Sequence, residues 1–145
     1  MSGRAAMCAD CQRRAQTGSL NRSWKGGRYI PMTLYNKWHR SAVRRDMEWN
    51  LTIEHLDNLY DFQQQRCALS GAALTLDHGQ NNGVDNGNAS LDRIDSDVGY
   101  VVGNVQFVTK DINMGKQKLS NADFVEMCRQ VALFNEQQGL FASAA

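Results

Sequence analysis

The chain has 145 residues, a length typical of a single domain, and its 42% apolar and 21% charged residues are typical of a globular protein with a buried core. No stretch approaches the ~18 uninterrupted apolar residues of a membrane-spanning helix, so we expect no membrane partner. The net charge of +1 is unevenly distributed: residues 1–50 hold ten Lys or Arg and three Asp or Glu, whereas residues 51–145 hold six and twelve. This asymmetry indicates a basic segment that binds a polyanion.

Residues 1–30 are polar, basic and interrupted by glycines, so we expect an irregular N-terminal arm. The arm has no apolar region like that of a secretory signal, and four scattered cysteines do not make a disulfide framework. Both features favour a cytoplasmic protein. Cys8 and Cys11 have the spacing of half a zinc site, but no second pair follows, so structural Zn²⁺ is kept as an alternative only.

A first helix is predicted after Pro31, a residue that suits a helix start. Leu34, Trp38 and Ala42 recur at i, i+4 and i+8 and form an apolar stripe. Basic residues fall largely on other sides of this helix: Lys37, Arg40, Arg44 and Arg45. Contact with the DNA backbone is the favoured role of this basic face, and a merely solvated face is the alternative.

A second helix is predicted from Thr52, which can cap it, to about Gln65. Ile53, Leu56 and Tyr60 lie on its core side. Residues 31–65 are therefore expected to be a helical segment that contacts DNA.

The part from residue 66 to 137 is predicted to combine strands and helices. Residues 72–76 are a candidate strand, and the Gly- and Asn-rich residues 77–88, which include His78, are expected to be an irregular loop. Strands at 89–94 and 105–108 and a helix at 110–118 follow. A last helix from Asn121 is expected to close over the small sheet, before a frayed tail at 138–145.

Residues 90–116 read SLDRIDSDVGYVVGNVQFVTKDINMGK and resemble the HNH, or ββα-metal, endonuclease motif. On this resemblance Asp92 and Asn113 correspond to the metal-binding residues of the motif. Asn104 corresponds to the Asn that organises the loop, and Lys116 to a trailing Lys that contacts phosphate. With the flanking YIPMTLYNKW and RCALSG, about two thirds of the chain is similar to bacteriophage-encoded HNH endonucleases, which implies the cytoplasm of a host cell.

The residue types agree with that chemistry. A carboxylate from Asp92 and an amide oxygen from Asn113 are hard ligands, suited to one Mg²⁺ or Mn²⁺ that polarises a scissile phosphate. Arg93 stands where the motif usually has its general-base His, and a guanidinium stays protonated, so it cannot act as that base. Three alternatives stay open: His78 is the base, a metal-bound water or hydroxide serves, or the site does not cleave. Arg93 is expected to clamp a phosphate.

The sequence thus predicts an α+β fold, in which an irregular basic arm and two helices precede a ββα-metal module and a closing helix. The predicted function is metal-dependent cleavage of DNA, by nicking or double-strand cutting. The leading alternative is a nuclease-like protein that binds DNA without cutting it. A third hypothesis is a zinc-ribbon interaction module, which would contain stoichiometric zinc.

Overall fold

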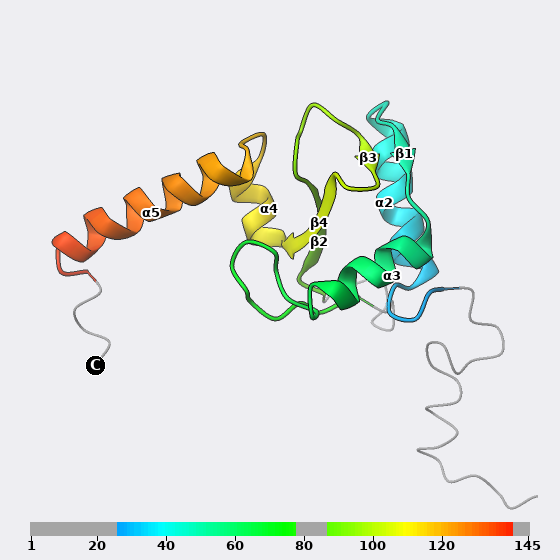
Figure 1. The fold of residues 1–145 in the computed structure, drawn as a ribbon, viewed down its shortest axis with the longest axis horizontal. Helices are drawn as coiled ribbons and strands as arrows, with labels where there is room; N and C mark the ends of the chain where they lie inside the picture. The colour runs from blue at the N-terminus through cyan, green and yellow to red at the C-terminus, as the bar shows by residue number, and fades with distance from the viewer. Residues whose placement is uncertain (1–25, 78–86, 141–145) are drawn as a thin grey trace, which may run out of the picture.

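The computed structural model describes residues 26–77 and 87–140, so the predictions for Cys8, Cys11 and His78 lie outside the described residues. The described ranges are mixed α+β, as expected, and contain no helix long and apolar enough to cross a membrane. Figure 1 shows the arrangement of the elements. In chain order they are α2 (Met32–Arg44), β1 (Trp49–Asn50), α3 (Ile53–Phe62), β2 (Ala89–Arg93), β3 (Tyr100–Val101), β4 (Val105–Thr109), α4 (Lys110–Lys116) and α5 (Asn121–Gln137).

Both predicted N-terminal helices are present. Pro31 precedes α2, and the hydroxyl oxygen of Thr52 caps α3 by accepting the backbone N–H of His55 at 3.1 Å. The helix α3 ends three residues earlier than predicted. Gln64 and Gln65 have positive φ angles of 54° and 58°, so the chain leaves the helical conformation there.

Residues 28–30 were predicted to belong to an irregular N-terminal arm, but the structure fixes them to the core. The carboxylate of Asp57 on α3 is buried and accepts the backbone N–H groups of Arg28, Tyr29 and Ile30. Ile30 is itself fully buried in the core. Three backbone donors on one carboxylate fix this segment against α3, an anchor that composition alone does not reveal.

A strand, loop, strand and helix follow one another from residue 89 to 116, as the sequence predicted. Strands β2 and β4 pair antiparallel, with Ala89 opposite Thr109 and Arg93 opposite Val105. The helix α4 begins directly after β4. The predicted strand at 72–76 is wrong: these residues form a single bridge, between Arg66 and Ala73, in place of a ladder.

A second small sheet was not predicted. Strand β1 pairs in parallel with β3, and both have two residues. Strands this short show no hydrophobic alternation, so their pairing depends on the tertiary fold. The backbone N–H of Tyr100 donates to the carbonyl of Glu48 at 2.8 Å, which extends this contact.

The core lies between the β2–β4 hairpin and the two N-terminal helices. Phe107 on β4 is fully buried, and its ring centroid lies 5.8 Å from that of Trp38 on α2 and 5.4 Å from that of Tyr60 on α3. Leu91 lies opposite Phe107 across the hairpin, so both point to this face. Residues of the other face point toward α4.

The expectation that the last helix closes over the sheet is wrong. Figure 1 shows α5 extending away from the rest of the described chain, and Phe124 is the one buried residue of this helix. The physical reason is that both faces of the β2–β4 hairpin are already covered, one by α2 and α3 and the other by α4. No sheet face is left for α5 to cover.

Candidate functional site

Three of the residues predicted to form the site meet between β2 and α4. Ser90 and Asp92 are two residues apart on β2, so their side chains share the face that points to α4. The side-chain amide of Asn113 donates to the hydroxyl of Ser90 at 2.7 Å. One helical turn further on, Nζ of Lys116 lies 3.3 Å from Oδ2 of Asp92. The fold therefore places Asp92, Asn113 and Lys116 along one interface.

The carboxylate of Asp92 is only 4% exposed and has two partners. One is the ammonium of Lys116, and the other is Gln106, whose side-chain N–H donates to Oδ2 at 2.8 Å. Gln106 stands directly opposite Asp92 on β4 and exchanges two hydrogen bonds with Asn121 at the start of α5. Sequence reasoning missed Gln106, although the hairpin register, once known, identifies it.

Lys116 does not offer an exposed charge to phosphate in this structure, contrary to the prediction. Its side chain is fully buried, and besides Asp92 it donates to the backbone carbonyl of Arg93 at 2.9 Å. A lysine buried to this degree needs a carboxylate partner, because an unpaired buried ammonium is costly. Lys116 thus supplies positive charge to Asp92 from within the protein.

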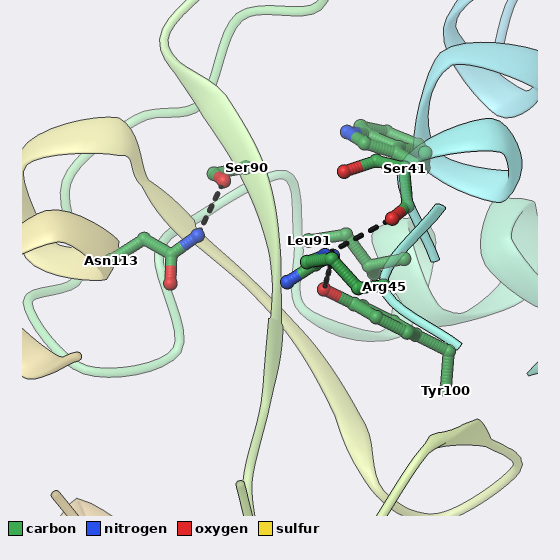
Figure 2. Close-up of a pocket in the computed structure, with 7 residues that line it drawn as sticks. Ser41, Arg45, Ser90, Leu91, Tyr100 and Asn113 are labelled. Atoms are coloured by element: carbon green, nitrogen blue, oxygen red, sulfur yellow. Dashed lines mark hydrogen bonds between the residues drawn. The ribbon is translucent and has the colours of Figure 1, made fainter. Parts of the chain in front are cut away.

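The site fits a hard cation in its donor types. Asp92 offers a carboxylate, and the amide oxygen of Asn113 points away from Ser90 (Figure 2). In the described ranges no cluster of three or more His, Cys, Asp or Glu side chains is arranged to hold a metal ion. An Asp and Asn pair suits Mg²⁺ or Mn²⁺, which keep several waters and take further oxygens from a phosphate.

Asn104 holds the loop that follows the strand of Asp92. Its side-chain oxygen accepts the backbone N–H of Asp95 at 2.9 Å. Its side-chain N–H groups donate to the carbonyls of Asp95 and Gly99, both at 3.0 Å. The residue is buried, so these three bonds fix the loop to the start of β4. The predicted hydrogen bonds from Asn104 to the loop are therefore present, and its role in a nuclease site stays a prediction.

Arg93 points to the opposite face of β2 from Asp92, since consecutive strand residues alternate. Its Nη1 donates to the carbonyls of Ser96 at 2.5 Å and Val98 at 3.0 Å. Its guanidinium also lies over the ring of Tyr100, 5.5 Å from the centroid. Arg93 and Asn104 therefore both stabilise the loop at residues 95–99, each by hydrogen bonds to its backbone.

A pocket of about 330 Å³ lies between α2 and the β2–α4 interface. Figure 2 shows Ser90 and Asn113 on one side of it and Arg45 and Tyr100 on the other. A guanidinium N–H of Arg45 donates to the hydroxyl of Tyr100 at 2.8 Å. The complete lining is Trp38, Ser41, Arg45, Ser90, Leu91, Tyr100 and Asn113.

The basic face of α2 continues into this pocket. Lys37, Arg40 and Arg44 line an adjacent hollow of about 390 Å³ together with Ser41, and Ser41 also lines the pocket that holds Asn113. These residues recur every three or four positions and so share one side of the helix. Of the four basic residues predicted to contact DNA, Lys37, Arg40 and Arg44 line this hollow. Arg45 lines the neighbouring pocket together with Asn113.

No protein-family model and no solved structure matches the chain. Among curated proteins it is similar to the "Uncharacterized 29.0 kDa protein in dda-modA intergenic region" of Enterobacteria phage T4. The two are 33% identical over 86 residues, which are 59% of this chain and 32% of the phage protein. The matched region therefore spans about a third of its relative, and the similarity relates this chain to a phage protein.

Proposed function

We propose that this protein is a metal-dependent endonuclease that hydrolyses phosphodiester bonds in DNA. The observation that carries the proposal is the pocket shared by α2 and α4. One wall holds Asn113 and Ser90, which lies two residues before Asp92 on β2, and the other continues into the basic face of α2. A DNA backbone bound along the basic face of α2 would therefore extend to the pocket that contains Asn113.

The side-chain oxygens of Asp92 and Asn113 would hold the divalent cation. When bound, Mg²⁺ or Mn²⁺ supplies a Lewis acid that polarises the scissile phosphate and stabilises the leaving oxygen. The protein's own part is to hold the two donors at the interface of β2 and α4, where Asn113 donates to Ser90 and Gln106 donates to Asp92. Asn104 fixes the following loop, so that the strand end does not shift.

Arg93 takes no proton in this proposal, because a guanidinium stays protonated at any ordinary pH. Its bonds to the carbonyls of Ser96 and Val98 assign it to support of the loop. The proton of the attacking water goes either to His78 or to solvent. Replacing His78 with Ala separates the two, since only the first assignment predicts a large loss of cleavage.

The basic residues of α2 would hold the duplex by its phosphates. The slope of log K against log salt concentration is negative, and each phosphate contact that is removed reduces its magnitude by about 0.9. The triple substitution Lys37→Ala, Arg40→Ala and Arg44→Ala is therefore expected to reduce the magnitude of the slope by roughly 2–3. An unchanged slope would place the DNA on another surface.

The direct test is nicking of supercoiled plasmid with Mg²⁺ or Mn²⁺. We expect cleavage by the wild type and a loss of at least about 100-fold in Asp92→Ala and Asn113→Ala, because each removes a proposed metal donor. Met114→Ala is the matched control, since Met114 is the neighbour of Asn113 on α4 and is 74% exposed. Equal cleavage by Asn113→Ala and Met114→Ala would contradict the proposed site.

The second candidate is a protein that binds DNA on the same surface and does not cut it. Two observations favour it: Arg93 stands at the position where a base is needed, and the ammonium of Lys116 already neutralises Asp92. Plasmid binding that persists without nicking in either metal would establish this alternative and refute the enzyme.

A further inference from the structure

The side-chain amide of Gln106 connects the candidate site to the first residue of α5. Gln106 lies on β4, is 6% exposed, and stands opposite Asp92 in the hairpin register. Its Nε2 donates to Oδ2 of Asp92 at 2.8 Å and to Oδ1 of Asn121 at 2.9 Å. The side-chain N–H of Asn121 donates back to Oε1 of Gln106 at 3.1 Å. Both N–H groups of the Gln106 amide and its oxygen are therefore bonded within the protein.

The exchange with Asn121 determines which end of the Gln106 amide faces Asp92. A side-chain amide has donors on its nitrogen and an acceptor on its oxygen. If the Gln106 amide turned by half a rotation, Oε1 would face the carboxylate of Asp92, acceptor against acceptor. The same rotation would break both bonds with Asn121 and leave buried polar groups unpaired, which is costly. Asn121 therefore stabilises the orientation in which Gln106 donates to Asp92.

The two oxygens of Asp92 differ in how closely they are held. Oδ2 accepts the bond from Gln106 at 2.8 Å and lies 3.3 Å from Nζ of Lys116. Oδ1 has a longer contact with the same ammonium, at 3.5 Å. Hydrogen bonds to one oxygen of a carboxylate orient it and leave lone pairs on the other oxygen for a cation. Oδ1 is thus the oxygen of Asp92 better able to accept a metal ion.

We propose that Asn121 is a positioning residue of the metal site, which acts through Gln106 to hold Asp92 with Oδ1 available to a divalent cation. This inference rests on the proposed function, because it takes Asp92 as a metal donor. Asn121 itself contacts neither the cation nor DNA. Replacing outer residues that orient a metal ligand typically lowers metal affinity by about 10–100-fold.

The surroundings of Asn121 separate this role from support of the helix. Asn121 is the first residue of α5, and the preceding Ser120 caps the helix by accepting the backbone N–H of Asp123 at 3.1 Å. Phe124 is buried and lies close to Gly115 of α4. The cap and this apolar contact hold the start of α5. The side chain of Asn121 is therefore held in place to orient Gln106, and the cap can be removed without removing the amide.

Binding of Mn²⁺ to the full chain without DNA tests the proposal, and it does not depend on cleavage. The electron paramagnetic resonance signal of free Mn²⁺ measures the bound fraction. Asn121→Leu and Asn121→Ala both remove the amide, and each is expected to weaken Mn²⁺ binding by about 10-fold. Ser120→Ala is the matched control, because it removes the cap of the same helix and leaves Gln106 paired, so its Mn²⁺ affinity should equal that of the wild type. Equal weakening in Ser120→Ala would overturn the proposal. Circular dichroism confirms that each variant folds.

A double variant tests whether Asn121 acts through Gln106. Gln106→Met removes the donor to Asp92, fills a similar volume, and is expected to weaken Mn²⁺ binding at least as much as Asn121→Leu. Once Gln106 is replaced, Asn121 has no amide to orient, so adding Asn121→Leu should cause no further loss. Losses that multiply in the double variant would overturn the proposal.

One further variant separates this inference from the proposed function. Asn113→Ala removes the other proposed metal donor and leaves Gln106 and Asn121 paired, so it too should weaken Mn²⁺ binding. Binding that falls in Asn113→Ala but not in Asn121→Leu would overturn the positioning role and leave the proposed metal site standing. A wild type that binds no Mn²⁺, or unchanged binding in Asn113→Ala, would overturn the metal site and the positioning role together.

Discussion

Replacing Lys116 with Met tests the buried ion pair at the centre of the candidate site. The ammonium is fully buried, lies 3.3 Å from Oδ2 of Asp92, and donates to the carbonyl of Arg93 at 2.9 Å. Methionine fills a similar volume without the charge. The substitution leaves the carboxylate of Asp92 buried with Gln106 as its hydrogen-bond partner. Breaking a buried pair in this way costs about 3–5 kcal/mol.

Thermal unfolding followed by circular dichroism measures this cost. For a chain of this length, a destabilisation of that size lowers Tm by roughly 10 °C. The double variant Asp92→Asn, Lys116→Met removes both charges and keeps an acceptor for Gln106, so we expect it to recover at least about 1–2 kcal/mol relative to Lys116→Met. The difference between the single and double variants isolates the cost of the unpaired carboxylate.

The same variants test whether Asp92 holds a metal. In Lys116→Met the ammonium no longer competes for the carboxylate, so Mg²⁺ or Mn²⁺ is expected to raise Tm more than in the wild type, and EDTA to reverse the rise. The double variant should lose this response. A Tm for Lys116→Met within about 2 °C of the wild type would refute the importance of the ion pair. No response to either cation in any variant would refute Asp92 as a donor.

Two further predictions concern the loop and the last helix. Asn104→Ala removes three hydrogen bonds and is expected to lower the free energy of unfolding by about 2–3 kcal/mol. Asn113→Ala removes one hydrogen bond and is expected to lower it by about 1 kcal/mol. Equal losses of stability in urea unfolding of the two variants would contradict the loop geometry. The bond from Arg129 lowers the pKa of Glu126 to about 2, from an ordinary 4.5, so their pair stabilises α5 above pH 4.5 and this contribution disappears as the pH falls through about 2. The difference in helical signal between the wild type and Glu126→Gln should therefore vanish at the acid end, and a difference that is constant with pH would contradict this sign.

Much of the local structure could be predicted because local patterns determine it. Pro31 and Thr52 mark helix starts, and the apolar spacing after each gives the buried side. The candidate strands at 89–94 and 105–108, separated by a turn, indicate a hairpin followed by a helix. Asp92, Asn104 and Asn113 all belong to this hairpin and helix. The sequence could therefore predict that they lie in one structural unit, but not the distances between their side chains.

Only the tertiary structure decided the environments of these residues. The sequence marks Lys116 as a charge, but burial of its ammonium on Asp92 depends on how tightly α4 packs against β2. Gln106 becomes a partner of Asp92 because the register places them opposite each other, and Asp57 becomes an anchor because α3 brings it to the backbone of the segment before α2. Such contacts join residues distant along the chain, and no periodic pattern encodes them.

The last helix illustrates the same division. The sequence by itself determined that α5 forms and which stripe of it is apolar, because capping and helical spacing are local properties. It did not determine what the stripe packs against. An apolar stripe predicts burial in general, and here both faces of the hairpin are already taken by other helices. The tertiary structure therefore decided that, among the described residues, nothing covers the stripe of α5 beyond Phe124.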